Sequence, residues 1–215
     1  DVPGTATSAS SRPPVTGIID LPAAQRQIDW SYDPAQDGST IVVTDDDPTA
    51  VLVTLAASAA VTHRIVALGR IAEVIDQAAI SCGMHAGWRL HAILDHLGRP
   101  PSSGSAGSAR ARPSTLVVCG NWGELVDSLD HHTAAALEGL LSHSRDLGLT
   151  LLLAGCRSGL RISSQFRSHL IFPPSAGGDG LSVGLSRHRF LGTWPRLRAV
   201  LVVPRTAECG GDGAD

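Results

Sequence analysis

Residues 41–52 read Ile41-Val42-Val43-Thr44-Asp45-Asp46-Asp47-Pro48-Thr49-Ala50-Val51-Leu52. The first residues are β-branched and apolar, which is typical of a buried strand. Three carboxylates follow, and Asp47-Pro48 then has the composition of a helix start, with aspartate as the N-cap and proline in the first turn. The segment therefore predicts a strand, a short acidic loop and a helix over 48–60, which together are half of a βαβ unit.

The same alternation of strand and helix continues along the chain. Further strands are predicted at 63–68, 115–119, 149–154, 168–172 and 199–203, and further helices at 71–79, 84–97 and 133–143. Strands that are apolar along nearly their whole length indicate a parallel sheet that is covered on both faces. The predicted fold is therefore α/β, with a mostly parallel sheet and helices on both sides. Ligands bind at the carboxyl ends of such strands, which points to the loops after Val43, Leu68, Cys119 and Ala154.

Length and composition suit a single domain. The chain has 215 residues, of which 43% are hydrophobic, enough for one α/β domain with a sizeable core. We expect a flexible arm over 1–16, the folded domain over 17–205 and a tail over 206–215. The Ser/Gly-rich segment 100–113 predicts a disordered loop within the domain. The sequence predicts neither a membrane-spanning helix nor a signal peptide.

The distribution of charged residues, cysteines and histidines argues against a nucleic-acid surface and against a metal site. All 17 basic residues are arginine, the net charge is −3 and no basic stripe is present, so no nucleic-acid surface is expected. No metal site is predicted, because no two cysteines have CxxC spacing and the histidines of the predicted helix over 84–97 do not share one face. These residues are Cys82, Cys119, Cys156 and Cys209, and His85, His91 and His96.

Five segments follow one another in an order that is found in one known family. They are the lead-in at 17–27, the strand and helix around 44–56, the strand and the residues that follow it at 116–125, the helix-to-strand step at 144–154 and the late strand at 195–203. Together they resemble the FtsK/SpoIIIE ATPases, most closely the tandem ATPase modules of EccC, the motor-like component of type VII secretion. The resemblance spans roughly residues 15–205 and implies a RecA-like P-loop NTPase architecture.

The residues that carry ATPase chemistry in that family are replaced here. A P-loop needs glycines, a lysine for the β- and γ-phosphates and a Ser or Thr for magnesium. The corresponding positions hold Thr44, Asp47, Pro48, Thr49 and Ala50, and the lysine position falls on Pro48 or Ala50. The two Walker B acids, which hold magnesium and polarise the attacking water, correspond to Gly120 and Asn121. The resemblance therefore implies a degenerate site with no catalytic residue.

The acidic loop also argues against a bound nucleotide. Pro48 removes one N–H group from a helix N-terminus that would otherwise bind phosphate. Asp45, Asp46 and Asp47 each repel a phosphate by about 3–4 kcal/mol at a separation of about 4–6 Å and an effective dielectric near 20. We predict no cofactor, neither bound ATP nor ATP hydrolysis, and we interpret Asp47 as a helix cap.

A binding role remains, since the nucleotide chemistry is missing while the fold is expected to persist. Trp122 and Arg157 follow two strands at the predicted ligand edge and belong to the residue types that dominate binding hot spots, so both are candidate partner-binding residues. Arg157 can instead form an ion pair with the acidic loop.

The resemblance implies recognition of a protein substrate, or regulation, in a type VII secretion motor. The expected partners are neighbouring ATPase modules and the signal segment of a secreted protein, with no nucleic acid. The expected location is the cytoplasm, within a membrane-associated complex. Two alternatives remain open: an active DNA- or protein-translocating ATPase module, and a stand-alone α/β protein of unknown chemistry.

Overall fold

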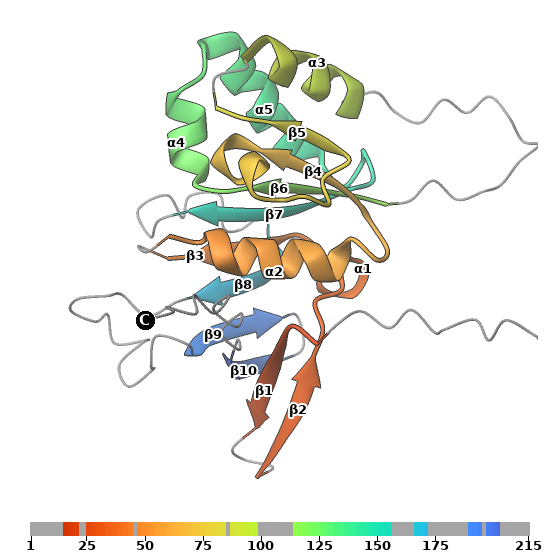
Figure 1. The fold of residues 1–215 in the computed structure, drawn as a ribbon, viewed down its shortest axis with the longest axis vertical. Coiled ribbons are helices and arrows are strands. Elements are labelled where there is room, and N and C mark those ends of the chain that lie inside the picture. The colour runs from red at the N-terminus through yellow and green to blue at the C-terminus, as the bar shows by residue number, and fades with distance from the viewer. Residues whose placement is uncertain are drawn as a thin grey trace, which may run out of the picture.

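A single ten-stranded sheet runs through the molecule in the order β2-β1-β10-β9-β8-β3-β7-β6-β4-β5 (Figure 1). The computed structural model describes residues 15–21, 25–44, 47–84, 87–98, 114–155, 166–171, 189–194 and 197–202. The strands are β1 (Gly17–Leu21), β2 (Arg26–Trp30), β3 (Thr40–Val43), β4 (Arg64–Leu68), β5 (Ile80–Cys82), β6 (Thr115–Cys119), β7 (Leu149–Gly155), β8 (Ser168–Ile171), β9 (Arg189–Trp194) and β10 (Leu197–Val202). The helices are α1 (Pro34–Asp37), α2 (Thr49–Ala59), the 3-10 helix η2 (Gly69–Glu73), α3 (Gly87–Leu97), α4 (Trp122–Asp127) and α5 (His131–His143).

Strands β8, β3, β7, β6, β4 and β5 form the parallel part of the sheet. Strands β9, β10, β1 and β2 extend it in antiparallel pairing. The predicted mostly parallel α/β fold is therefore confirmed. None of the described helices is long and apolar enough to cross a bilayer.

The parallel strands are buried because their side chains alternate between two cores. On one face, Val42 and Val118 pack against the apolar side of α2, which contributes Leu52 and Leu55. On the other face, the neighbouring strand residues pack beneath α3, α4 and α5. A strand that is covered on both faces has no polar face, which explains the near-continuous apolar runs of the sequence. The helices therefore cover both faces, as predicted.

Several elements differ from the sequence prediction. The segment 71–79 was expected to be helical, but the structure has the short η2 there, followed by the edge strand β5. Gly69 has φ +78°, a left-handed conformation that ends β4 and starts η2. The predicted arm up to residue 14, the Ser/Gly loop and the tail lie outside the described residues.

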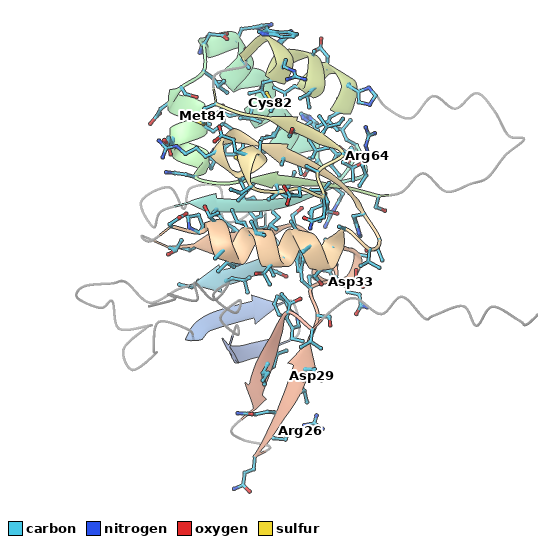
Figure 2. All side chains as sticks on the ribbon, viewed as in Figure 1. Arg26, Asp29, Asp33, Arg64, Cys82 and Met84 are labelled. Atoms are coloured by element: carbon cyan, nitrogen blue, oxygen red, sulfur yellow. The ribbon has the colours of Figure 1, made fainter. Side chains whose placement is uncertain are left out.

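The hairpin of β1 and β2, like β9 and α4, was not predicted from the sequence. Its outer strand β2 carries Arg26 and Asp29, whose exposed side chains lie on the strand that extends away from the helices (Figure 2). Because β2 is polar and only its last residue, Trp30, is buried, it lacks the apolar run that identifies the central strands. Pairing with β1 makes it a strand.

Helix α1 joins this hairpin to the central sheet through a half-buried carboxylate. Asp33 caps the helix by accepting a hydrogen bond from the Ala35 N–H at 3.0 Å. One carboxylate oxygen of Asp37 accepts a hydrogen bond from the Asp33 N–H at 3.0 Å, and the Asp37 carbonyl accepts one from the Ser168 hydroxyl of β8 at 2.7 Å. Burial is the main reason why the pKa of Asp37 is raised to about 6.

This raised pKa predicts a pH-dependent stability. The folded state prefers the protonated carboxyl, so the cost of the charged form is complete above pH 6 and fades as the pH falls toward the unfolded value near 4. Asp37→Asn keeps an acceptor oxygen but carries no charge. We expect it to raise the free energy of unfolding by on the order of 1–3 kcal/mol at pH 7.5, with the gain disappearing by pH 4.

Urea denaturation at both pH values measures this difference. Asp29→Asn is the matched control, because it removes the exposed carboxylate of β2 and should change stability little at either pH. A gain from Asp37→Asn that does not depend on pH would show that the Asp37 charge is not its cause.

Candidate functional site

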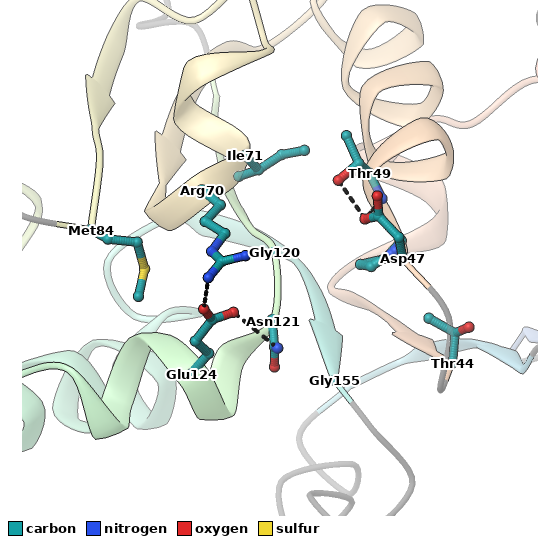
Figure 3. A pocket seen from close by; sticks show the side chains of 11 residues that line it. Thr44, Asp47, Thr49, Arg70, Ile71, Met84, Gly120, Asn121, Glu124 and Gly155 are labelled. Atoms are coloured by element: carbon teal, nitrogen blue, oxygen red, sulfur yellow. Dashed lines mark hydrogen bonds and ion pairs between the residues drawn. The ribbon is translucent and has the colours of Figure 1, made fainter.

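A cavity of about 320 Å³ opens where the parallel strands reach their carboxyl ends. Its lining comes from the segments that follow β3, β4, β5 and β6 and from the last residue of β7 (Figure 3). The lining residues are Thr44, Asp47, Pro48, Thr49, Arg70, Ile71, Met84, Gly120, Asn121, Glu124 and Gly155. The structure thus brings together the predicted P-loop position and the predicted Walker B position. Ala50 is the exception, since it is exposed on α2 and outside the lining.

On the P-loop side, the Asp47 carboxylate accepts hydrogen bonds from the first residue of α2. The Asp47 Oδ1 atom accepts hydrogen bonds from the Thr49 N–H at 3.0 Å and from the Thr49 hydroxyl at 2.6 Å. The helix begins at Thr49 with Pro48 at the N-cap position, one residue later than predicted. Asp47 therefore lies one residue before the N-cap and is not itself the N-cap residue as predicted, but its side chain occupies two donors at the helix start that a phosphate would otherwise use. Asp45 and Asp46 lie outside the described residues.

On the Walker B side, neither residue offers a carboxylate. Gly120 follows β6 directly, and Asn121 adopts a left-handed backbone with φ +24°, which asparagine tolerates better than most residues. The Asn121 amide donates a hydrogen bond to Glu124 Oε2 at 3.2 Å. The thiol of Cys119, one residue earlier, is fully buried, and burial raises its pKa to about 12. It therefore stays protonated and is not a nucleophile.

An ion pair that the sequence did not reveal lies on one side of the cavity, opposite Asp47 and Thr49 (Figure 3). The Arg70 guanidinium of η2 contacts Glu124 Oε1 of α4 at 2.5 Å, so the two oxygens of Glu124 are divided between Arg70 and Asn121 (Figure 3). The Arg70 side chain is 76% exposed, and a pair of this kind contributes only about 0–1 kcal/mol to stability. The pair matters more for the charge of the cavity than for stability. Among the described lining residues, Arg70 is the one cation and is already paired, while Asp47 adds a second carboxylate.

Of the two predicted partner-binding residues, the structure describes Trp122 but not Arg157. Trp122 is the first residue of α4, half-buried, and packs against the core that lies under α3, α4 and α5. It lies next to Asn121 in sequence but is not among the described residues that line the cavity. Arg157 lies outside the described residues. Both remain predictions.

The histidines of α3 lie away from the cavity. The ring of His91 packs 5.3 Å from that of His132 on α5, measured between centroids. His96 is exposed near the end of α3, and His85 lies outside the described residues. Within the part of the chain that the structure describes, no three His, Cys, Asp or Glu side chains are grouped to hold a metal ion.

Solved structures show where this architecture occurs elsewhere. EssC (ATPases 2 and 3) from Geobacillus thermodenitrificans superimposes with a TM-score of 0.67 at 13% identity, over 93% of this chain and 46% of that one. EccC (ATPases 2 and 3) from Thermomonospora curvata, in complex with a signal sequence peptide, gives 0.63 at 16% identity, over 92% and 41%. The cytoplasmic domain of the Thermomonospora curvata type VII secretion ATPase EccC gives 0.59 at 19% identity, over 94% and 27%.

This chain has the fold of those ATPase domains. It spans less than half the length of each of these three chains. No protein-family model matches the sequence, and no curated protein matches it. The RecA-like architecture that the sequence resemblance implied is therefore confirmed at the level of the fold.

The capping contact gives a prediction for this site. Asp47→Ala removes the acceptor of both Thr49 donors and should lower the free energy of unfolding by about 0.5–2 kcal/mol. Asp47→Asn is the matched control, since asparagine is an equally good cap and should retain most of the stability. Urea denaturation of the two variants is the measurement. Equal losses in both, reversed by added magnesium, would instead identify Asp47 as a metal ligand.

Proposed function

We propose that this chain is a catalytically inactive ATPase-fold module that acts by binding protein, in substrate recognition or regulation within a type VII secretion motor. The observation that carries the proposal is the composition of the cavity. It lies where the resembling ATPases place their nucleotide site, yet its described lining contains no lysine and has glycine and asparagine at the Walker B positions. These replacements remove the groups that hold magnesium, contact the phosphates and position water.

The contacts within the cavity support the same proposal. A nucleotide phosphate would have to displace Asp47 from the start of α2 and Glu124 from Arg70. The Asp47 carboxylate would also repel a phosphate at about 5 Å by roughly 3 kcal/mol at an effective dielectric near 20. The only cation of the described lining is thus neutralised by the chain itself, and binding of ATP is disfavoured before any question of turnover.

The proposed partners follow from the likeness and from the chemistry that remains. One structure with this fold is EccC in complex with a signal sequence peptide. For this chain we propose a signal segment of a secreted protein and neighbouring ATPase modules as partners, at the carboxyl edge of the sheet near Trp122 and Arg157. The proposed location is the cytoplasm, as part of a membrane-associated assembly. The neighbour that supports it is a cytoplasmic domain of a secretion ATPase.

The first test of this proposal is ATP turnover. A phosphate-release assay on the purified chain with magnesium and ATP should show no steady-state hydrolysis. Gly120→Asp restores one Walker B acid, and its Cβ has room, with the nearest atom, the Ile71 Cβ, at 3.5 Å. It should remain inactive, since magnesium, phosphate and water positioning act as a unit. Turnover above about 0.1 per second, well below ordinary enzyme rates, that is lost in Arg70→Ala would overturn the proposal.

The second test is partner binding. The wild-type chain is used to enrich a protein from its source cells, and the enriched protein is then titrated by calorimetry. Trp122→Ala and Arg157→Ala should each weaken its binding by about 1–3 kcal/mol. Because Trp122 is half-buried, the thermal unfolding midpoint of each variant must be measured beside its affinity. Val61→Ala is the control, since this exposed valine lies outside the cavity lining. An affinity that neither substitution changes would exclude this edge.

A further inference from the structure

A second surface lies at the β5 end of the sheet, away from the cavity described above. A groove of about 460 Å³ runs between β5 and α3, and its described lining shares no residue with that of the cavity. We call it the β5–α3 groove. It is lined by Ala79, Ile80, Ser81, Trp88, Arg89, Ala92 and Ile93.

Trp88 gives this groove an apolar wall that faces solvent. Its side chain is 78% exposed, the largest value among the exposed large hydrophobic residues of the described chain. Helix α3 places Leu90, Leu94 and Leu97 in the core, which leaves Trp88 on a different side of the helix. A tryptophan buries roughly 150–250 Å² when it is covered. A partner that covers it would remove this apolar area from water.

The backbone of β5 supplies the second feature. In the described sheet β5 is an edge strand that pairs with β4 alone. The Ala79 N–H donates to the Ile65 carbonyl at 2.9 Å, so residue 79 directs its backbone groups toward β4. Successive residues of a strand direct these groups to opposite sides. The N–H and C=O of Ile80 consequently face the open edge, where another strand can pair with them.

Charge supplies the third feature. The Arg89 guanidinium lies 5.9 Å from the centre of the Trp88 ring, and no carboxylate pairs with it among the described residues. A cation stacked on an aromatic ring keeps its donors directed outward. An acidic side chain of a partner can therefore pair with Arg89 while an apolar neighbour covers Trp88.

We propose that the β5–α3 groove binds an extended acidic peptide segment, which adds to the sheet as a strand beside β5. The backbone of the segment pairs with Ile80, an apolar side chain covers Trp88, and a carboxylate two residues away on the same face pairs with Arg89. Main-chain pairing supplies affinity in this binding mode, and the alternate side chains supply specificity. The site is separate from the cavity, so this inference does not depend on the proposed function.

The probe is a fluorescein-labelled peptide, Thr-Leu-Thr-Glu-Thr-Val with blocked ends, titrated with the 215-residue chain and followed by fluorescence anisotropy. Leucine and glutamate lie on the same face of this extended peptide. We expect saturable binding that Trp88→Ala weakens at least tenfold, while Val61→Ala, at an exposed valine outside the groove lining, leaves it unchanged. Circular dichroism confirms that each variant is folded.

A charge exchange tests the acidic contact. Arg89→Glu should weaken binding of the glutamate peptide at least tenfold and should strengthen binding of the same peptide with lysine in place of glutamate. A peptide with proline at the central threonine should lose binding, because proline cannot donate to β5.

Three results would overturn the proposal. One is anisotropy that stays flat up to millimolar protein, and another is binding that is indifferent to Trp88→Ala and Arg89→Glu. The third is self-association of the chain that depends on Trp88 and is not reduced by the peptide, which would assign the groove to a second copy of this chain.

Discussion

The burial of the parallel strands on both faces is the constraint on which the rest of this structure depends. Residues of β3, β6 and β7 alternate between the core under α2 and the core under α3, α4 and α5. Because both faces are covered, a change of register by one residue would exchange every side chain between two differently shaped cores. The register is therefore fixed, and so is the relative position of the loops at the carboxyl ends. The cavity is a consequence of this packing.

The packing of this fold does not depend on the residues that line the cavity. Nothing in the two cores depends on a lysine at the start of α2 or on acids after β6, since no described lining residue apart from Ile71 belongs to the buried hydrophobic core. Within the cavity the chain makes contacts with itself. Asp47 bonds to Thr49, and Glu124 bonds to Arg70 and Asn121. These contacts leave the surrounding surface available for a different use, which we propose is protein binding.

The sequence predicted those elements whose side chains decide their structure locally. Strands β3, β4, β6 and β7 are apolar runs, and α2 and α5 follow an aspartate at or near the helix start, so their existence could be predicted before their positions were known. Strand β2 and the three-residue β5 could not be predicted, because pairing with β1 and β4 makes them strands and their own composition does not.

The same distinction applies to the site. Thr44, Asp47, Gly120 and Asn121 follow predictable strands, and the parallel topology brings them to one cavity. Arg70 and Glu124 were missed, since their contact joins residues 54 positions apart, on η2, where the sequence predicts a helix that starts only at residue 71, and on α4, which is not predicted. The only feature of the sequence that could have indicated them is that each lies within a few residues of the end of a predicted strand.

The central claim is that the chain itself occupies the contacts that a nucleotide would need. The most direct measurement is the free energy of unfolding in urea, with and without magnesium-ATP at about 5 mM. A ligand that binds only the folded state raises this free energy by RT ln(1 + [L]/Kd), which is about 1 kcal/mol for a Kd near 1 mM at about 5 mM ligand. We predict no change. A rise of about 1 kcal/mol or more that is lost in Arg70→Ala would show that ATP binds in the cavity and would contradict this account.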